Sequence, residues 1–348
     1  MAAAVEAQVA GTGLWSRLTG IMKQFGTLIK VGLLVACIVA LAYALPQKPW
    51  PMLLGQLDLM WHHWSTTLLV ILLCPLNWAL EAIKWQVLSR SYRPVSFWTS
   101  YKGILTGLGI GALMPQGLGD FLGRTWHHKH DNDRQQLHAI PALWLGNFAS
   151  FQVTHFFGLA GLSYLFWSGQ LMSQLGQMRW SWGYGVLTIA LLALTLSVYY
   201  RVAWYAQPVL RLRWLSRWRP QLERSLQFGD KVRTQALVLA TLRYLTFIGQ
   251  WWLLLRLTGP PTTTDLGLIA AICLIFSLKS SIPRLSLLGD LGVREYTAVI
   301  VLQWMGWQAA QVIPLTLFIW VVNLLVPTLI GFVLMLPVFR PQPSKHTN

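Results

Sequence analysis

Pro115-Gln116-Gly117-Leu118-Gly119-Asp120-Phe121-Leu122-Gly123-Arg124 is the stretch that decides how this chain folds, because its pattern returns later. The second copy runs from Pro283 through Gly289-Asp290-Leu291-Gly292-Val293-Arg294-Glu295. Each copy follows an apolar run, 96–114 or 264–282, and places proline, glycine and charged residues where a membrane helix would otherwise continue. The pattern predicts two hairpins that enter a membrane partway and return to the same side.

The composition around these stretches is that of an integral membrane protein. Of the 348 residues, 55% are hydrophobic and 11% are charged, whereas about 25% of the residues in a soluble domain are charged. The 20 tryptophans suit membrane interfaces. The formal net charge of +16 lies in the segments between apolar runs, which favours anionic lipid head groups over nucleic acid as partners.

The apolar runs predict an all-α, polytopic membrane helix bundle that forms one transmembrane domain over residues 30–338. Residues 1–29 predict an interfacial N-terminal helix, and residues 339–348 form a polar tail. The basic segment 201–234 predicts a helix on the inner leaflet. Full spans are expected at about 30–46, 66–89, 139–168, 182–200, 235–257 and 309–338.

The distribution of Lys and Arg indicates whether the motif-bearing segments cross the membrane. If neither crosses, both termini are cytoplasmic, and the outer segments hold only Lys48 and Arg179 as basic residues. If the first apolar arm crossed fully, the eight Lys and Arg of segment 201–234 would face outward, against the positive-inside rule. We therefore expect two re-entrant hairpins in the cell (inner) membrane, entering from opposite sides.

Each hairpin lies between two full spans, so the chain divides into halves of about 66–168 and 235–338. The chain crosses the membrane three times between the start of the first span of one half and the start of the first span of the other. Because this number is odd, the two halves have opposite orientations in the membrane. Inverted repeats with broken helices near the midplane are typical of secondary transporters. Because irregular backbone at membrane depth is tolerated where it lines a cavity, the two motifs predict a central cavity.

The charged residues of the motifs are the first candidates for substrate binding. Asp120 lies four residues before Arg124, and the second motif repeats this spacing with Asp290 and Arg294. Each pair shares a helix face and forms a local ion bridge or binds a substrate. Ionisable groups in a membrane commonly line a substrate path, and the planar guanidinium matches phosphate. Further candidates at a similar depth are Glu81, Lys84, Lys279, Arg284 and Glu295.

The charges of Glu81 and Lys84 also have a simpler explanation than substrate binding. They are three residues apart and could pair with each other on the second span. Lys84 could alternatively extend to the inner surface of the membrane. We therefore rank them below the motif residues.

The sequence gives little support for metal or enzyme chemistry. The three cysteines lie in apolar runs and are typical of core residues. His127, His128 and His130 point in different directions on a helix and lack a Cys or a nearby Glu, so we expect a solvated loop and no metal. No recognised catalytic or nucleotide-binding motif occurs, so neither catalysis nor a cofactor is expected.

Three segments carry a family resemblance by their order and spacing. They are Asn77-Trp78-Ala79-Leu80-Glu81-Ala82-Ile83-Lys84-Trp85, the first motif with Gly119-Asp120-Phe121, and Gly292-Val293-Arg294-Glu295. Over about residues 20–338 the chain resembles the lysylphosphatidylglycerol synthase transmembrane-region family, also called flippase-like proteins. The resemblance implies a bundle with re-entrant segments and a role in moving lipids or lipid-linked molecules between leaflets. The best-known members add a soluble transferase domain, for which this chain has no room, so we expect no synthase activity.

Two departures from the family's pattern bear on the substrate. The family commonly has Pro-Asn-Arg ahead of the first Gly-Glu, whereas this chain has Pro115-Gln116-Gly117 and then Asp120. The second motif has Leu287-Leu288-Gly289 in place of the usual pair of glycines. The substrate is expected to differ accordingly.

Together these patterns predict a flippase-like protein that moves a lipid or lipid-linked anionic molecule between leaflets through a central charged cavity. An intramembrane lipid-modifying enzyme or a non-transporting partner subunit is the alternative. A chemically changed lipid product would indicate the enzyme. With no nucleotide-binding motif, transport would be gradient-driven, exchange-like or downhill.

Overall fold

The computed structural model describes residues 50–90, 92–113, 116–126, 139–169, 182–210, 223, 227–258, 263–282 and 292–335. Several predicted features lie outside these residues. They are the interfacial helix 1–29, the span at 30–46, the His-rich stretch from 127 onward, the middle of the basic segment 201–234 (211–222 and 224–226), and the polar tail. Asp290 and Arg284 lie outside them as well.

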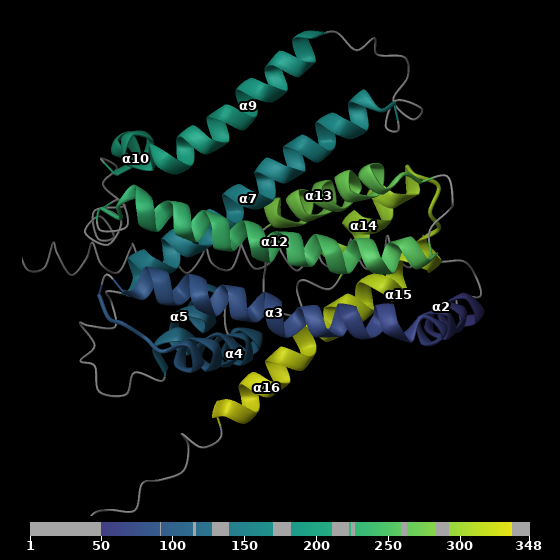
Figure 1. Cartoon of the computed structure of the whole chain (residues 1–348), viewed down its shortest axis with the longest axis horizontal. Helices are drawn as coiled ribbons and strands as arrows, with labels where there is room; N and C mark the ends of the chain where they lie inside the picture. Colours follow the sequence, from purple (N-terminus) through teal and green to yellow (C-terminus); the bar gives the residue numbers. More distant parts are fainter. Residues whose placement is uncertain are drawn as a thin grey trace, which may run out of the picture.

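The described residues fold into helices, with no strand among them (Figure 1). This agrees with the all-α prediction. Short helix α2, before the first long helix, was not predicted. In chain order the helices are α2 (Trp50–His62), α3 (Trp64–Ser89), α4 (Phe97–Leu113), α5 (Gln116–Trp126), α7 (Ala139–Trp167), α9 (Trp182–Tyr200), α10 (Val202–Leu210), α12 (Asp230–Thr258), α13 (Asp265–Ser281), α14 (Val293–Gln303), α15 (Ala309–Trp320), a π-helical turn (Val321–Leu325) and α16 (Val326–Met335).

Four stretches are long and apolar enough to cross a membrane, among the helices that the structure describes. They are Trp64–Ser89, Gly183–Tyr200, Asp230–Thr258 and Ala309–Met335. Each coincides with a predicted span. The span expected at 139–168 forms α7, whose 29 residues are about 43 Å long. This length would cross a membrane, although α7 is not among these four stretches.

Each of the long helices α3 and α12 is followed by a pair of short helices, and the two pairs have the same lengths. After α3, α4 has 17 residues and α5 has 11. After α12, α13 has 17 residues and α14 has 11. At 1.5 Å per residue these arms are about 25 Å and 16 Å long, so none of them matches the roughly 30 Å hydrocarbon core of a bilayer.

Glycines bring α4 and α5 into direct backbone contact. A Cβ atom added to Gly123 would lie 2.1 Å from the Cα of Gly107, and one added to Gly119 would lie 2.3 Å from the Cα of Gly111. On the other side of α4, a Cβ on Gly331 of α16 would lie 2.0 Å from the carbonyl oxygen of Leu105. Small residues are common where membrane helices pack this closely. The glycine-rich arm therefore forms a tightly packed three-helix unit.

Helix α13 packs antiparallel to α7 and ends near its middle. Gly161 faces Ala270, and Gly158 faces Ser277, with a hypothetical Cβ on Gly158 only 2.1 Å from the Ser277 Cβ.

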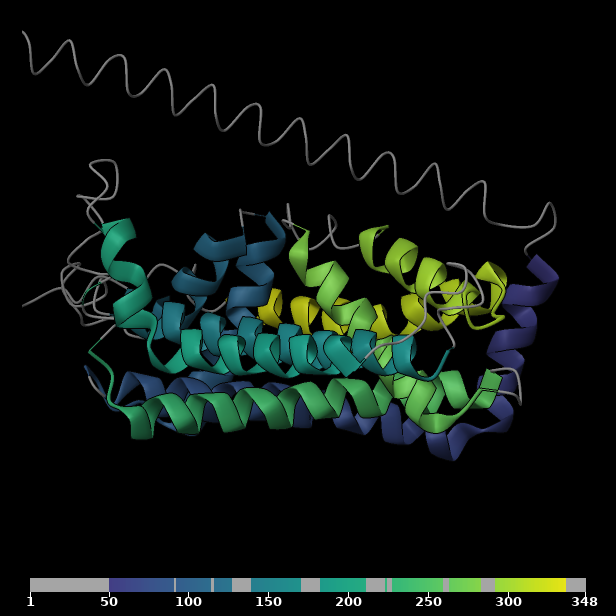
Figure 2. The ribbon, with the colours of Figure 1, turned by 90° about the horizontal axis from the view of Figure 1, so that it is seen from above.

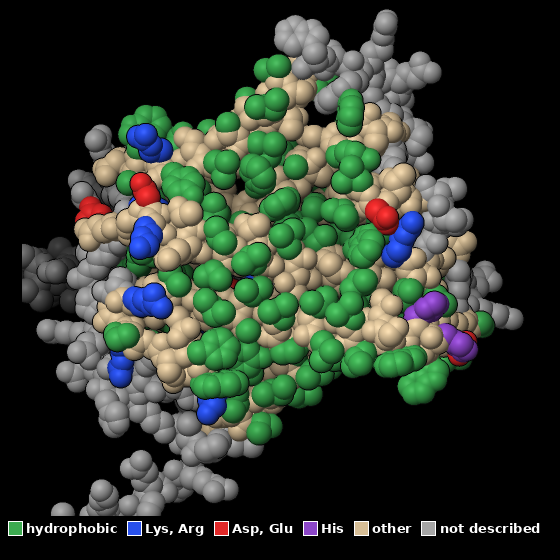
Figure 3. Space-filling model, viewed as in Figure 1, with side chains coloured by type: hydrophobic (Ala, Val, Ile, Leu, Met, Phe, Trp, Pro, Cys, Tyr) green, Lys and Arg blue, Asp and Glu red, His purple; other side chains and the backbone are tan. Residues whose placement is uncertain are grey.

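In Figure 2, α4 and α5 lie on the same side of the α3–α12 layer as α14 and α15. On the face shown in Figure 3, most of the Lys and Arg side chains lie at one end of the bundle, where α3 ends and α12 begins.

Candidate functional site

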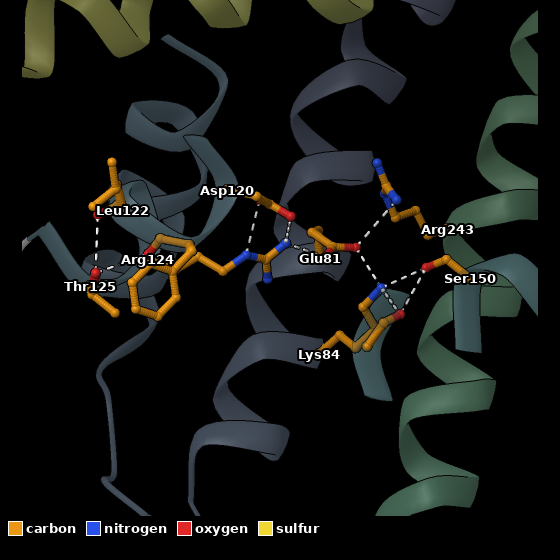
Figure 4. Close-up of polar contacts among 10 residues, drawn as sticks. Glu81, Lys84, Asp120, Leu122, Arg124, Thr125, Ser150 and Arg243 are labelled. Atoms are coloured by element: carbon orange, nitrogen blue, oxygen red, sulfur yellow. Dashed lines mark hydrogen bonds and ion pairs between the residues drawn. The ribbon is translucent and has the colours of Figure 1, made fainter. Parts of the chain in front are cut away.

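The Glu81 carboxylate is the centre of a buried group of charged side chains (Figure 4). Its Oε1 accepts a hydrogen bond from Arg124 Nη2 at 2.9 Å, while its Oε2 lies 2.8 Å from Lys84 Nζ. Arg243 Nη1 lies 3.3 Å from the same Oε2. The Glu81 side chain is only 4% exposed. Three cations from α3, α5 and α12 therefore converge on one carboxylate.

Arg124 connects this group to the first motif. Its Nε donates to Asp120 Oδ1 at 3.1 Å, and its Nη2 lies 3.3 Å from Asp120 Oδ2. The guanidinium lies over the ring of Trp85, 4.9 Å from the centroid. The side chain of Arg124 is 5% exposed, but that of Asp120 is 28% exposed. The predicted i,i+4 pairing therefore forms, and Asp120 is its more accessible member.

Lys84 is enclosed by acceptors and does not extend to a surface. Besides Glu81, its ammonium donates to Ser150 Oγ at 2.8 Å and to the carbonyl oxygen of Gly146 at 3.2 Å. These three acceptors match the three protons of the group. Because the side chain is 1% exposed, the alternative of a Lys84 that reaches the inner surface is wrong. Its bonds instead hold α3 against α7.

Arg243, in the middle of α12, is the member of the group that sequence reasoning missed. It is 20% exposed and lies over the rings of Trp78 and Phe247, at 5.1 Å and 5.3 Å from their centroids. The available signal was an arginine inside the predicted span 235–257. With it, the Glu81 cluster comprises three cations (Lys84, Arg124, Arg243) and two carboxylates (Glu81, Asp120) among the described residues.

The second motif forms an ion pair of its own on α14. Arg294 pairs with the adjacent Glu295, and both are buried. Glu295 Oε2 also accepts from the backbone N–H of Gly292 at 2.7 Å, which caps the start of α14. Gly292 has φ of +88°, a conformation that favours glycine. Because Asp290 lies outside the described residues, the expected pairing of Asp290 with Arg294 stays a prediction; Lys279 lies in the last turn of α13.

The matched family settles what kind of protein this is. The model of the lysylphosphatidylglycerol synthase TM region matches residues 19–331. The chain belongs to that family. A comparison with curated proteins found no match. Membership confirms the family resemblance and, with the four apolar helices, makes this a multi-pass membrane protein.

In this member of the lysylphosphatidylglycerol synthase TM region family, the residues that carry the resemblance form two separate clusters in the structure. Glu81 and Lys84 from the first segment meet Asp120 and Arg124 from the second in the Glu81 cluster. The third segment, with Arg294 and Glu295, supplies the ion pair on α14. Two of the three segments thus build one buried site although they lie on different helices.

A second buried polar group contacts α3 nearer its start, at Val70 and Cys74. Gln250 Nε2 donates to the carbonyl oxygen of Val70 at 2.8 Å, and Gln250 and Asn323 exchange hydrogen bonds of 2.9 Å and 3.2 Å between their amides. Asn323 lies in the π-helical turn, where Val322 O accepts from Cys74 Sγ at 3.1 Å. Sequence reasoning missed this group, which joins α3, α12 and the last helix.

Metal ligands do not cluster in the part of the chain that the structure describes. It contains no group of three or more His, Cys, Asp or Glu side chains able to hold a metal ion. The histidines at 127, 128 and 130 lie outside the described residues, so the prediction made for them stays a prediction.

Proposed function

We propose that the protein moves a lipid or lipid-linked anionic molecule between the leaflets of the inner membrane. The observation that carries this proposal is the convergence of two arginines and a lysine from three helices on one buried carboxylate. Guanidinium and ammonium groups form strong charge-assisted hydrogen bonds with phosphate and carboxylate groups, so an anionic group is the ligand that such a site favours. The family's name refers to the synthesis of an aminoacylated phospholipid, which also supports a lipid substrate.

The two arginines of the cluster suit a phosphate. A guanidinium presents parallel N–H donors that match two phosphate oxygens, and Arg124 already uses this fork on Asp120. We propose that the carboxylates of Glu81 and Asp120 occupy Arg124 and Arg243 when no lipid is bound. A lipid phosphate would then replace the more accessible Asp120 first. On the second hairpin, Arg294, Glu295, Lys279, Asp290 and Arg284 are proposed to complete the site.

The lengths of the helices support two re-entrant hairpins in an inverted repeat. The arms α4 and α13 are about 25 Å long, and α5 and α14 about 16 Å. The long helices that flank each hairpin support halves of about 66–168 and 235–338 within one transmembrane domain. The Lys and Arg gathered at one end of the bundle support a cytoplasmic position for that end. We propose that both termini are cytoplasmic as well.

The experiment is lipid transfer between leaflets of liposomes that contain the purified protein. A fluorescent phosphatidylglycerol and a fluorescent phosphatidylcholine are compared, because only the first has a net negative head group. The wild type is expected to transfer the anionic lipid faster. Removing a cation of the cluster with Arg243→Gln is expected to slow that transfer at least tenfold, since one good charge-assisted contact is worth about 1.5–3 kcal/mol.

Arg256→Gln is the matched control. Arg256 is on the same helix, but its side chain is 46% exposed and pairs with Asp265, so its variant should transfer lipid like the wild type. If Arg243→Gln, folded and reconstituted equally well, also transfers lipid like the wild type, the site assignment is wrong. Chromatography of the recovered lipid decides the alternative: a chemically changed product would identify an intramembrane enzyme instead.

A further inference from the structure

The Arg124 guanidinium makes two kinds of contact, one with an aromatic ring and one with carboxylates. The ring of Trp85 covers a face of the guanidinium, with 4.9 Å between Arg124 Cζ and the ring centroid. The carboxylates bind at the edges: Nε and Nη2 hold the two oxygens of Asp120, and Nη2 also donates to Glu81. A ring stacked on the face leaves the in-plane N–H donors accessible, so the two kinds of contact exist together.

Trp85 is a fixed part of the fold. Its side chain is only 1% exposed, and its ring packs edge-on against Tyr92, with centroids 6.3 Å apart. Its Nε1 has no hydrogen-bond partner among the described residues. The indole therefore acts on Arg124 through its ring face, and packing determines where that face lies.

Asp120, in contrast, is the part of the arrangement that a ligand can replace. Its side chain is 28% exposed, whereas that of Arg124 is 5% exposed. Its two oxygens bind the Nε–Nη2 edge of Arg124 in the way that two oxygens of a phosphate bind a guanidinium. When a phosphate takes this edge, Arg124 keeps its hydrogen bond to Glu81 and its contact with Trp85.

Arg243 repeats this arrangement on α12. Its guanidinium lies over the rings of Trp78 and Phe247, and its Nη1 lies 3.3 Å from Glu81 Oε2. Trp78 and Trp85 are seven residues apart on α3, so they lie on one face of that helix with Glu81 between them. Each arginine of the Glu81 cluster is thus held by Glu81 and by a tryptophan ring of α3.

We propose that Trp85 is a positioning residue for lipid binding, which holds Arg124 in place while a lipid phosphate replaces Asp120. This inference rests on the proposed lipid site. A cation–π contact needs no counter-charge and is strongest where water is excluded, so it keeps the guanidinium ordered during the exchange. An arginine that is already in position loses less side-chain freedom when the phosphate binds, which increases the affinity. The rings over Arg243 have the same role.

The experiment is a titration of the full-length protein in detergent with short-chain phosphatidylglycerol, with stabilisation against unfolding as the measure of binding. Trp85→Leu removes the ring, so the apparent Kd is expected to rise about tenfold or more. Trp85→Phe keeps a ring face and loses only the indole N–H, so the Kd should stay within about threefold of the wild type. Short-chain phosphatidylcholine should bind the wild type more weakly, because its head group has no net charge.

Trp251→Leu is the matched control. Trp251 is also 1% exposed, but its ring packs against Phe276. This variant should unfold at a lower temperature, as Trp85→Leu does, and still bind phosphatidylglycerol with the affinity of the wild type. Wild-type affinity in Trp85→Leu would overturn the proposal. It would also be overturned if Trp85→Phe lost as much affinity as Trp85→Leu, because the ring face would then not be what matters.

Binding in detergent requires no transfer between leaflets, so this result is separate from the transport test. A protein that binds phosphatidylglycerol through Trp85 but does not transfer it would refute transport and leave the role of Trp85 standing. Inorganic phosphate is a further probe: a weaker affinity for it in Trp85→Leu would support the same role with phosphate alone as the ligand. A wild type that binds phosphatidylglycerol no more tightly than phosphatidylcholine would overturn the anion site and this inference with it.

Discussion

Arg124 donates a hydrogen bond to Glu81 at 2.9 Å although 43 residues separate them in the chain. This bond joins the short second arm of the first hairpin to the long helix α3, and both side chains are almost fully buried. Lys84 and Arg243 complete the arrangement around the same carboxylate. The position of the hairpin against the bundle therefore depends on one acidic side chain.

The first prediction concerns that side chain. Glu81→Gln keeps the shape of Glu81 but removes the negative charge that Lys84, Arg124 and Arg243 share. Removing one partner of a buried ion pair typically costs about 3–5 kcal/mol. We expect a lower unfolding temperature, measured in detergent by intrinsic tryptophan fluorescence. Asp58→Asn is the control, because Asp58 is 72% exposed and pairs only weakly with His62. Equal losses in the two variants would contradict the role of Glu81.

The second prediction concerns the glycine contacts between α4 and α5. Gly123→Ala adds a methyl group 2.1 Å from the Cα of Gly107, so the two helices must separate. Overpacking of this kind typically costs about 1–3 kcal/mol. Gly249→Ala is the control: it lies on α12 with nothing within 4 Å of the added atom, and replacing a helical glycine by alanine stabilises by about 1 kcal/mol. Unfolding free energies that shift in the same direction for both would show that α4 and α5 are not in contact.

The long helices could be predicted from the sequence because an apolar run must hydrogen-bond its own backbone in a membrane. The Asp120–Arg124 pair could be predicted too, because its spacing alone places both residues on one helix face. Whether the hairpins are re-entrant stays a prediction. The partners of Glu81 on other helices could not be predicted, since periodicity gives the face of a helix and not the helix that it meets.

Arg243 shows this limit most clearly. Its sequence neighbours are apolar, so the sequence is equally compatible with an arginine that faces lipid and with one that is buried between helices. Only the packing of α12 beside α3 brings it to Glu81. Lys84 shows the same limit, because an extended Lys reaches an aqueous surface or an internal acceptor equally well. Here Ser150 and Gly146 of α7 supply those acceptors.

The third prediction concerns the amide pair of Gln250 and Asn323. Each side chain is buried, and each single Leu variant leaves the other amide without its partner. Coupling energies for such bonds in membrane proteins average about 0.6 kcal/mol and reach about 1.7 kcal/mol. We expect Gln250→Leu and Asn323→Leu each to destabilise the protein, and the double variant to lose less than the sum of the two. Strict additivity in a double-mutant cycle of unfolding free energies would contradict this coupling.

The last prediction separates charge from geometry at the proposed lipid site. Arg124→Lys keeps the positive charge, but a single ammonium cannot reproduce the fork that holds Asp120 and Glu81 together. If the fork also binds a lipid phosphate, transfer of fluorescent phosphatidylglycerol should fall about tenfold or more, while phosphatidylcholine transfer changes less. Arg256→Lys, at an exposed ion pair on α12, should leave both rates unchanged. A folded Arg124→Lys protein that transfers phosphatidylglycerol at the wild-type rate would show that the guanidinium holds the hairpin in place without taking part in lipid recognition.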